Sequence, residues 1–326
     1  MSLTQIRPAP PAPQPAERVS KSKLWWHRFD TKTVPYILIA PFFVLFAIFG
    51  LFPLIYNAVV SFRYWRLDDP TKTGWSGLAN YTQLFTDEDF WNALFNTFGI
   101  FILSTVPQLL LALTIANLLN HRLRGTTWWR VAVLLPYVTP VAASTLLFSM
   151  FFARDYGMAN WFLSLVGFGQ EQPLDWRAEK WSSWIAIATM VNWKWIGYNA
   201  LLYLSAMQAI PRDVYEAAAV DGAGPQRQLW QITVPMIQPV VIFTVVLSTI
   251  GGLQLFNEPM LFDENPALAR GGSDHQWQTM AQLIYEVGWR DLNLGYAAAM
   301  SWALFLIILV VAAINALLTR RFGGGR

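Results

Sequence analysis

The stretch GYAAAMSWALFLIILVVAAINALL, residues 295–318, contains no charged side chain. At about 1.5 Å of rise per residue, a helix of this length crosses the roughly 30 Å hydrocarbon core of a bilayer. It is longer than the buried helices expected in soluble domains. Five earlier segments share this length and apolar character. The sequence therefore predicts six membrane-spanning helices, at residues 34–62, 91–119, 131–152, 184–210, 236–257 and 295–318.

The composition of the whole chain agrees with a membrane protein. Apolar residues make up 55% of its 326 residues and charged residues 13%, about half the share of charge found in globular domains. None of the six segments alternates polar and apolar residues with the period of two that a membrane β-barrel requires. The absence of cysteine excludes disulfides and thiolate metal sites. We therefore expect an all-α membrane protein.

The distribution of Lys and Arg predicts the orientation of these helices. If the N-terminus is cytoplasmic, 14 of these residues fall in cytoplasmic segments and 8 in the opposite loops, and Lys194, inside a helix, completes the 23 of the chain. An excess of positive charge marks the cytoplasmic side. Both termini are thus expected there. A multi-pass domain at 34–318, embedded in the lipid bilayer of the cell membrane, lies between a basic, disordered tail at 1–33 and a short tail at 319–326.

Residues 276–289, in the last outside loop, have apolar side chains at helical spacing. A short helix there has two interpretations. It is either an interfacial cap on the helix bundle or a loop that meets an extracellular partner. Periodicity alone does not identify a partner, and we favour the cap.

The segment IPRDVYEAAAVDGAGPQRQLWQITVPMIQP, residues 210–239, lies in the predicted cytoplasmic loop before the fifth span. Pro211 suits the first position of a helix, and the acidic residues that follow it favour the positive end of the helix dipole. Three alanines continue the helix with little side-chain bulk. Gly222 and Gly224 then predict a turn, after which 226–233 forms a second short helix. The pattern predicts a helix–turn–helix on the cytoplasmic face.

This segment resembles a known signature. It contains Glu216-Ala217-Ala218, then Gly222 after three further residues, and an Ile-Thr-Val-Pro sequence after nine more. This pattern is similar to the EAA motif of permease subunits in binding-protein-dependent ABC importers. Val234 stands where that motif usually has Leu. The resemblance implies a type I importer permease fold, in which this segment is the coupling helix that docks into an ATPase subunit. The alternative is an ordinary amphipathic connector. The implied coupling residues are Arg212, Asp213, Glu216, Ala217, Ala218, Asp221, Gly222, Ile232 and Pro235 within 211–235.

The resemblance extends to the sugar branch of these permeases, the maltose- and oligosaccharide-type proteins. It implies that the substrate is a sugar, with a di- or oligosaccharide preferred, and does not identify which one. Residues 1–30 are not covered by it. The stretches that carry it are LPYVTP at 135–140, DYGMAN at 155–160, GYN at 197–199, FNEP at 256–259 and GYAAA at 295–299.

Polar residues inside membrane spans are costly and mark candidate substrate pathways. The fourth span places Lys194 near the bilayer centre, with Trp195 and Tyr198 on the same helix face. Hydrogen-bonding and aromatic groups together suit a sugar. In the alternative, Lys194 pairs with a carboxylate or extends to the interface, and the aromatic residues only pack. Gly251 and Gly252 permit either close packing or a local break of the fifth helix. The candidate pathway residues are Asn192, Lys194, Trp195, Tyr198, Asn199, Ser248, Gln254 and Asn257.

Several function classes are not supported by the sequence. It contains no phosphate-binding G-x-x-x-x-G-K-[ST] loop, no metal-binding histidine pattern and no catalytic constellation. An intramembrane enzyme is therefore not expected, nor is a cofactor bound by this chain. ATP and Mg²⁺ are expected on a partner ATPase. The spans hold essentially no carboxylates, which an ion-coupled secondary transporter of a polar solute, the main alternative, would need.

The partners that the resemblance implies are a second, homologous permease in a heterodimer, two ABC ATPase subunits and an extracytoplasmic sugar-binding protein. No nucleic acid is expected.

Overall fold

The computed structural model of the chain describes residues 33–69, 71, 73–121, 124–169, 172–263 and 270–323. The predicted tail at 1–33 lies outside the described residues except for Thr33. The chain divides into two compact units, 1–57 and 58–326. The described part of the first unit is helical. It consists of α2 (Val34–Phe46), the π-helical turn η1 (Ala47–Leu51) and the beginning of α3 (Phe52–Ser61).

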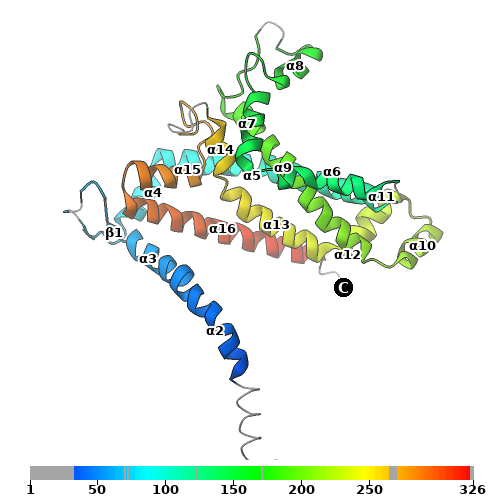
Figure 1. Ribbon diagram of the computed structural model, residues 1–326, viewed down its shortest axis with the longest axis horizontal. Coiled ribbons are helices and arrows are strands. Elements are labelled where there is room, and N and C mark those ends of the chain that lie inside the picture. Colours follow the sequence, from blue (N-terminus) through cyan, green and yellow to red (C-terminus); the bar gives the residue numbers. More distant parts are fainter. Residues whose placement is uncertain are drawn as a thin grey trace, which may run out of the picture. The chain divides into compact units, whose positions relative to one another are not determined.

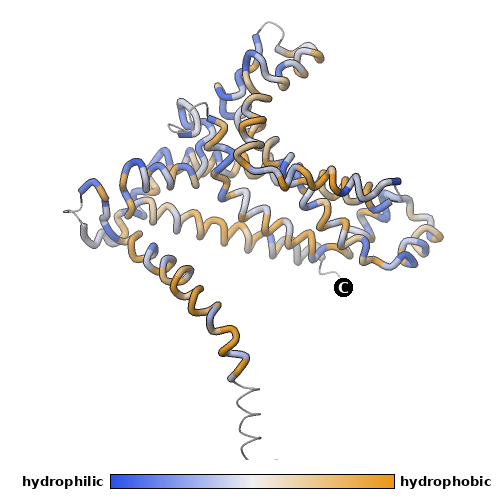
Figure 2. The backbone as a smooth tube through the Cα atoms, in the orientation of Figure 1, coloured by the Kyte–Doolittle hydropathy of each residue, from blue (hydrophilic) through white to orange (hydrophobic). Residues whose placement is uncertain are grey.

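No residue of α2 is buried, although nearly all of its side chains are apolar. Figure 2 shows hydrophobic residues along most of α2 and also along α16 (Leu294–Gly323). An exposed apolar helix of this kind is stable in lipid, where its backbone groups are all paired within the helix. The first predicted span is therefore helical as expected.

The second unit is built around four long helices. These are α5 (Glu88–Asn120), α9 (Lys180–Gln208), α13 (Gln238–Leu253) and α16. The α9 helix packs along α5, and α13 packs against both α5 and α16 (Figure 1). Fully buried side chains fill the contacts between these helices, among them Ile100, Trp184, Tyr203, Met207 and Met300.

Shorter elements connect the long helices. They include β1 (Arg63–Tyr64), β2 (Gly74–Trp75), α4 (Ala79–Thr86), α6 (Thr126–Val138), α7 (Val141–Phe151), α8 (Met158–Leu165), α10 (Arg212–Val220), α11 (Pro225–Gln228), η3 (Leu229–Thr233), α12 (Val234–Met236), α14 (Asn257–Phe262), α15 (Met280–Tyr285) and η4 (Glu286–Arg290). In Figure 1, α10, α11 and the C-terminal end of α16 lie at one end of the second unit, and α4, α15 and β1 lie at the other.

Two glycines allow α9 to approach its neighbours closely. A Cβ added to Gly197 would lie 1.8 Å from the backbone oxygen of Val133 in α6, and one added to Gly99 in α5 would lie 2.2 Å from the ring of Trp184 in α9. Small residues at helix crossings are typical of membrane bundles, where close backbone approach provides the packing energy. The position of α9 between α5 and α6 therefore depends on these two sites.

All six predicted spans contain helix, but they differ in whether their helices are long and apolar enough to cross a membrane. Among the described residues, Val34–Ser61, Glu88–Asn120 and Leu294–Asn315 are long and apolar enough to cross a membrane, and two bent helix pairs bring the number to as many as five. The remaining predicted span is α9, whose 29 residues are sufficient in length but include buried polar side chains such as Asn199. The last helix also continues to Gly323, beyond the predicted boundary at 318.

The third predicted span, 131–152, is not one helix. It consists of α6 and α7, which are bent by 91° with respect to each other. The break falls at Thr139, whose backbone is extended, and Pro140, which caps α7. A proline disfavours the helical conformation of the residue before it, and proline itself has no N–H to donate. The prediction of a continuous third helix is therefore wrong.

The fifth predicted span, 236–257, is also shorter than expected. A bend of 75° separates Pro225–Met236 from α13, which begins at Gln238 and ends at Leu253. Pro239 lies in the first turn of α13, where its missing N–H is tolerated. Asn257 then begins a separate helix, α14.

The predicted helix at 276–289 forms only from Met280 onward, as α15 followed by the turn η4. Thr279 and Gln282 make a capping box at its beginning. The buried side chains of Met280 and Leu283 pack in the cluster formed with α5 and α16. This burial favours the interpretation as a cap on the bundle.

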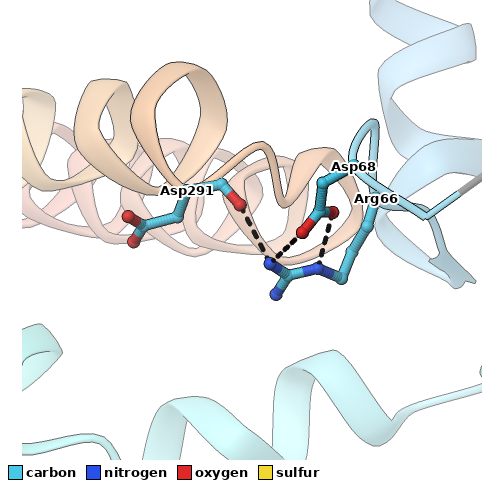
Figure 3. Close-up of polar contacts among 3 residues, drawn as sticks. All are labelled: Arg66, Asp68 and Asp291. Atoms are coloured by element: carbon cyan, nitrogen blue, oxygen red, sulfur yellow. Dashed lines mark hydrogen bonds and ion pairs between the residues drawn. The ribbon is translucent and has the colours of Figure 1, made fainter.

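The loop after α3 is fastened to the beginning of α16. Leu67 donates a backbone hydrogen bond to Leu292 (2.8 Å), and Gly295 donates one to Trp65 (3.1 Å). Figure 3 shows the side chain of Arg66, which donates to both carboxylate oxygens of Asp68 (3.0 and 2.9 Å) and to the backbone oxygen of Asp291 (3.2 Å). The Arg66 guanidinium lowers the pKa of the exposed Asp68 carboxyl.

Substituting Gly197→Ala should separate α9 from α6. The added methyl group has no space at the Val133 carbonyl, and overpacking of this kind costs about 1–3 kcal/mol. We expect a lower melting temperature of the detergent-purified protein. Gly74→Ala, where a Cβ meets nothing within 4 Å, is the control. Equal melting temperatures for the two variants would contradict the close crossing.

Candidate functional site

A cavity of about 450 Å³ lies within the second unit, lined mainly by α9, α13 and α14 with contributions from α5, α6 and α7. Pockets of this size hold small organic ligands. It contains seven of the eight residues predicted for the substrate pathway: Lys194, Trp195, Tyr198, Asn199, Ser248, Gln254 and Asn257. Asn192 does not line the cavity, and its buried Oδ1 has no hydrogen-bond partner among the described residues.

Three aromatic side chains form one wall of the cavity. The rings of Tyr137 and Tyr198 are stacked, with centroids 4.9 Å apart and planes 22° apart. The Trp195 ring meets both edge-on, at 5.3 Å from Tyr137 and 5.9 Å from Tyr198. Such an arrangement presents flat apolar faces together with a polar hydroxyl and an indole N–H.

The Lys194 ammonium is placed by the bend between α6 and α7. Its Nζ donates a hydrogen bond to the backbone oxygen of Thr139 at 2.7 Å. The bend frees this carbonyl from the helix, and a buried ammonium needs acceptors. In the described part of the chain no carboxylate lies within ion-pair distance of Lys194, so the alternative of a direct ion pair is not realised, although the charge of Glu258 in the same cavity acts on Lys194. Only 7% of it is exposed.

The two glycines of α13 have different surroundings. A Cβ on Gly252 would lie 2.7 Å from the ring of Phe101 in α5, so this glycine permits close helix packing. Gly251 faces open space and lines the cavity. The helix continues through both residues. The possibility of a local break at this pair is therefore not realised.

Sequence reasoning missed Glu258, which lines the cavity from α14 and is 7% exposed. Burial raises the pKa of its carboxyl, while its own backbone N–H and the charge of Lys194 act in the opposite direction. The residue belongs to the FNEP stretch at 256–259, but we placed it beyond the end of the fifth span. Thr105, Gln108 and Tyr137 also line the cavity and were not among the candidates.

The predicted coupling segment forms two arms joined by a turn. The first arm is α10, and the second comprises α11, η3 and α12. Gly222 has φ +79°, which explains the glycine at the turn. The hydroxyls of Tyr215 and Thr233 share a hydrogen bond of 3.0 Å that joins the arms. Pro211 precedes α10 as its N-cap and does not occupy the first helical position.

Most of the predicted coupling residues are exposed. Ala218 is buried and Ile232 is half-buried. The exposed members of the set are Arg212, Asp213, Glu216, Ala217, Asp221, Gly222 and Pro235.

The cavity and the coupling segment are parts of one continuous path along the chain. The α9 helix, which carries Lys194 and Tyr198, ends at Gln208, and α10 begins at Arg212. The second arm leads through α12 directly into α13, the other cavity helix. The coupling segment is therefore connected at its two ends to the two main cavity helices.

A family model described as the binding-protein-dependent transport system inner membrane component matches residues 97–324. The chain belongs to that family. It is accordingly a membrane transport subunit and not an enzyme, and membership does not favour an ion-coupled carrier. The family match includes α10 and every residue that lines the cavity.

Named relatives of this permease cover most of its length. The arabinooligosaccharides transport system permease protein AraP of Halalkalibacterium halodurans is 31% identical over 93% of either chain. The lactose transport system permease protein LacF of Rhizobium radiobacter is 33% identical over 85% of this chain and 91% of its own.

A solved structure has the same fold. It is one chain of a bacterial alginate ABC transporter, solved in complex with an alginate pentasaccharide-bound periplasmic protein. The two chains superpose with a TM-score of 0.76 and are 20% identical in sequence. The match covers 91% of this permease and 98% of that chain.

Cysteine labelling can test the cavity because the chain contains no cysteine. Ser248→Cys in the cavity wall should react with a small hydrophilic thiol reagent. Thr249→Cys should react at least about tenfold more slowly, because Thr249 is fully buried next to Asn315. Equal labelling rates in the purified protein would contradict a water-accessible cavity at this position.

Proposed function

We propose that this permease carries a di- or oligosaccharide across the cytoplasmic membrane, driven by ATP hydrolysis on separate subunits. The observation that carries the proposal is the cavity on α9 and α13, because both helices continue into the exposed coupling segment. One structural unit thus joins a ligand-sized cavity to a docking surface.

The chemistry of the cavity suits a carbohydrate. A sugar has apolar ring faces that pack on aromatic rings, and Tyr137, Trp195 and Tyr198 provide such a wall. Its hydroxyls need hydrogen-bond partners, which the amides of Asn199, Gln254 and other residues supply. The names of the relatives agree, since they specify arabinooligosaccharides and lactose. The alginate transporter moves a polysaccharide, although an acidic one.

The energy source is assigned to partner subunits. Two ABC ATPase subunits bind ATP and Mg²⁺, and one of them receives α10 in a surface cleft. The exposed side chains of Arg212, Asp213 and Glu216 support this docking, because charged residues on a short helix can form directed contacts with a partner. Closure of the ATPase pair would then displace α10 and open the cavity alternately to the two sides.

The remaining partners complete the transport path. A second, homologous permease forms a heterodimer with this chain and closes the pathway across the membrane. An extracytoplasmic sugar-binding protein delivers the substrate. The family description, which names a binding-protein-dependent system, and the periplasmic protein bound to the alginate transporter support this arrangement.

The proposed orientation places both termini and α10 in the cytoplasm. The excess of Lys and Arg in those segments supports it. In Figure 1, α10 and the C-terminal end of α16 lie at the same end of the second unit, as this orientation requires.

Replacing Glu216 with Gln should uncouple transport without preventing membrane insertion. Loss of one charged docking contact worth about 1.4 kcal/mol lowers ATPase binding on the order of tenfold. We expect less ATPase to co-purify with Glu216→Gln and sugar uptake to fall in proportion. Glu88→Gln, which removes an exposed carboxylate from the beginning of α5, is the matched control. Normal uptake and co-purification in Glu216→Gln would contradict the proposed coupling role.

A further inference from the structure

The cavity contains two charged side chains among the described residues that line it, the Lys194 ammonium and the Glu258 carboxylate. Both are 7% exposed. Their charges are of opposite sign and interact, so the lining contributed by this chain is neutral overall. The other polar groups of the wall are amides, hydroxyls and an indole.

The two charged groups differ in what they are bound to. Lys194 uses its ammonium to hold the Thr139 carbonyl at the bend. Within the described part of the chain, no side chain donates a hydrogen bond to the Glu258 carboxylate, although a backbone N–H and the charge of Lys194 favour its ionised form. A carboxylate has acceptor sites for about four hydrogen bonds. The buried Nδ2 of Asn199, also in the cavity wall, likewise has no acceptor among the described residues.

We propose that Glu258 is a specificity-determining residue that restricts the cavity to uncharged sugars, with Lys194 balancing its charge. The inference rests on the proposed function and names the substrate class of the same site. Sugar hydroxyls donate to the open carboxylate oxygens in charge-assisted hydrogen bonds. A sugar carrying a carboxylate, sulfonate or phosphate meets a like charge in a poorly hydrated site and is disfavoured.

The test uses the permease assembled with its partner permease and ATPases in lipid nanodiscs, without the binding protein, so that its own preference is measured. The probes are a neutral glucose disaccharide, the corresponding glucuronic acid disaccharide and the corresponding glucosamine disaccharide. Dissociation constants are determined by isothermal titration for the wild type, Glu258→Gln, Lys194→Gln and the double variant. Glu179→Gln, an exposed carboxylate before α9, is the control.

The wild type should bind the neutral disaccharide on the order of tenfold more tightly than the glucuronic acid form, which corresponds to about 1.4 kcal/mol of binding free energy. In Glu258→Gln the uncompensated Lys194 should abolish or reverse that preference. In Lys194→Gln the uncompensated Glu258 should shift the preference toward the glucosamine form. The double variant should again prefer the neutral disaccharide, and Glu179→Gln should behave as the wild type.

Two kinds of result would overturn the proposal. The first is tighter binding of the glucuronic acid form by the wild type. The second is an unchanged ratio of the neutral to the charged dissociation constants in the variants. If Glu258→Gln does not assemble, an absent shift in Lys194→Gln alone contradicts the proposal. If the wild type binds none of the three disaccharides, the sugar function itself is wrong and this inference falls with it.

Discussion

The close packing of α9 between α5 and α6 is the contact on which the rest of the site depends. At one crossing the backbone of Gly197 lies against the Val133 carbonyl, and at another the ring of Trp184 covers Gly99. Neither approach is possible with a larger residue at the glycine. Because α9 carries one wall of the cavity and leads within a few residues to α10, these two contacts determine where both functional surfaces lie.

One pair of buried polar groups in this bundle forms at a break between two helices. The bend between α6 and α7 exposes the Thr139 carbonyl, and the ammonium of Lys194 binds it. Each feature alone would be costly in a membrane, since an unpaired carbonyl and an unpaired ammonium both lose hydration. Together they fix the position of a positive charge beside the cavity. Just before this bend, Tyr137 of α6 stacks on Tyr198 and contributes to the aromatic wall.

Local features of the sequence were sufficient to predict the helical segments and much of the site. Long apolar runs predicted the long helices, and the glycine at 222 predicted the turn that its positive φ confirms. Helical spacing brought Lys194, Trp195 and Tyr198 to one face, and they do line one cavity. The bend at Thr139 and Pro140 was missed because membrane helices often continue through proline. Glu258 was missed because its role depends on how α14 folds back toward α9, which no local pattern encodes.

The coupling segment between α9 and α13 is proposed to bind a cytoplasmic ATPase. Cysteine cross-linking tests this binding directly, because the chain has no cysteine of its own. Val220 at the end of α10 is 88% exposed, and Tyr156, in a loop predicted outside, is 77% exposed. In membranes containing the whole transporter, a short bifunctional thiol reagent should join Val220→Cys to an ATPase subunit and leave Tyr156→Cys unlinked. An ATPase adduct from Tyr156→Cys and none from Val220→Cys would contradict the account.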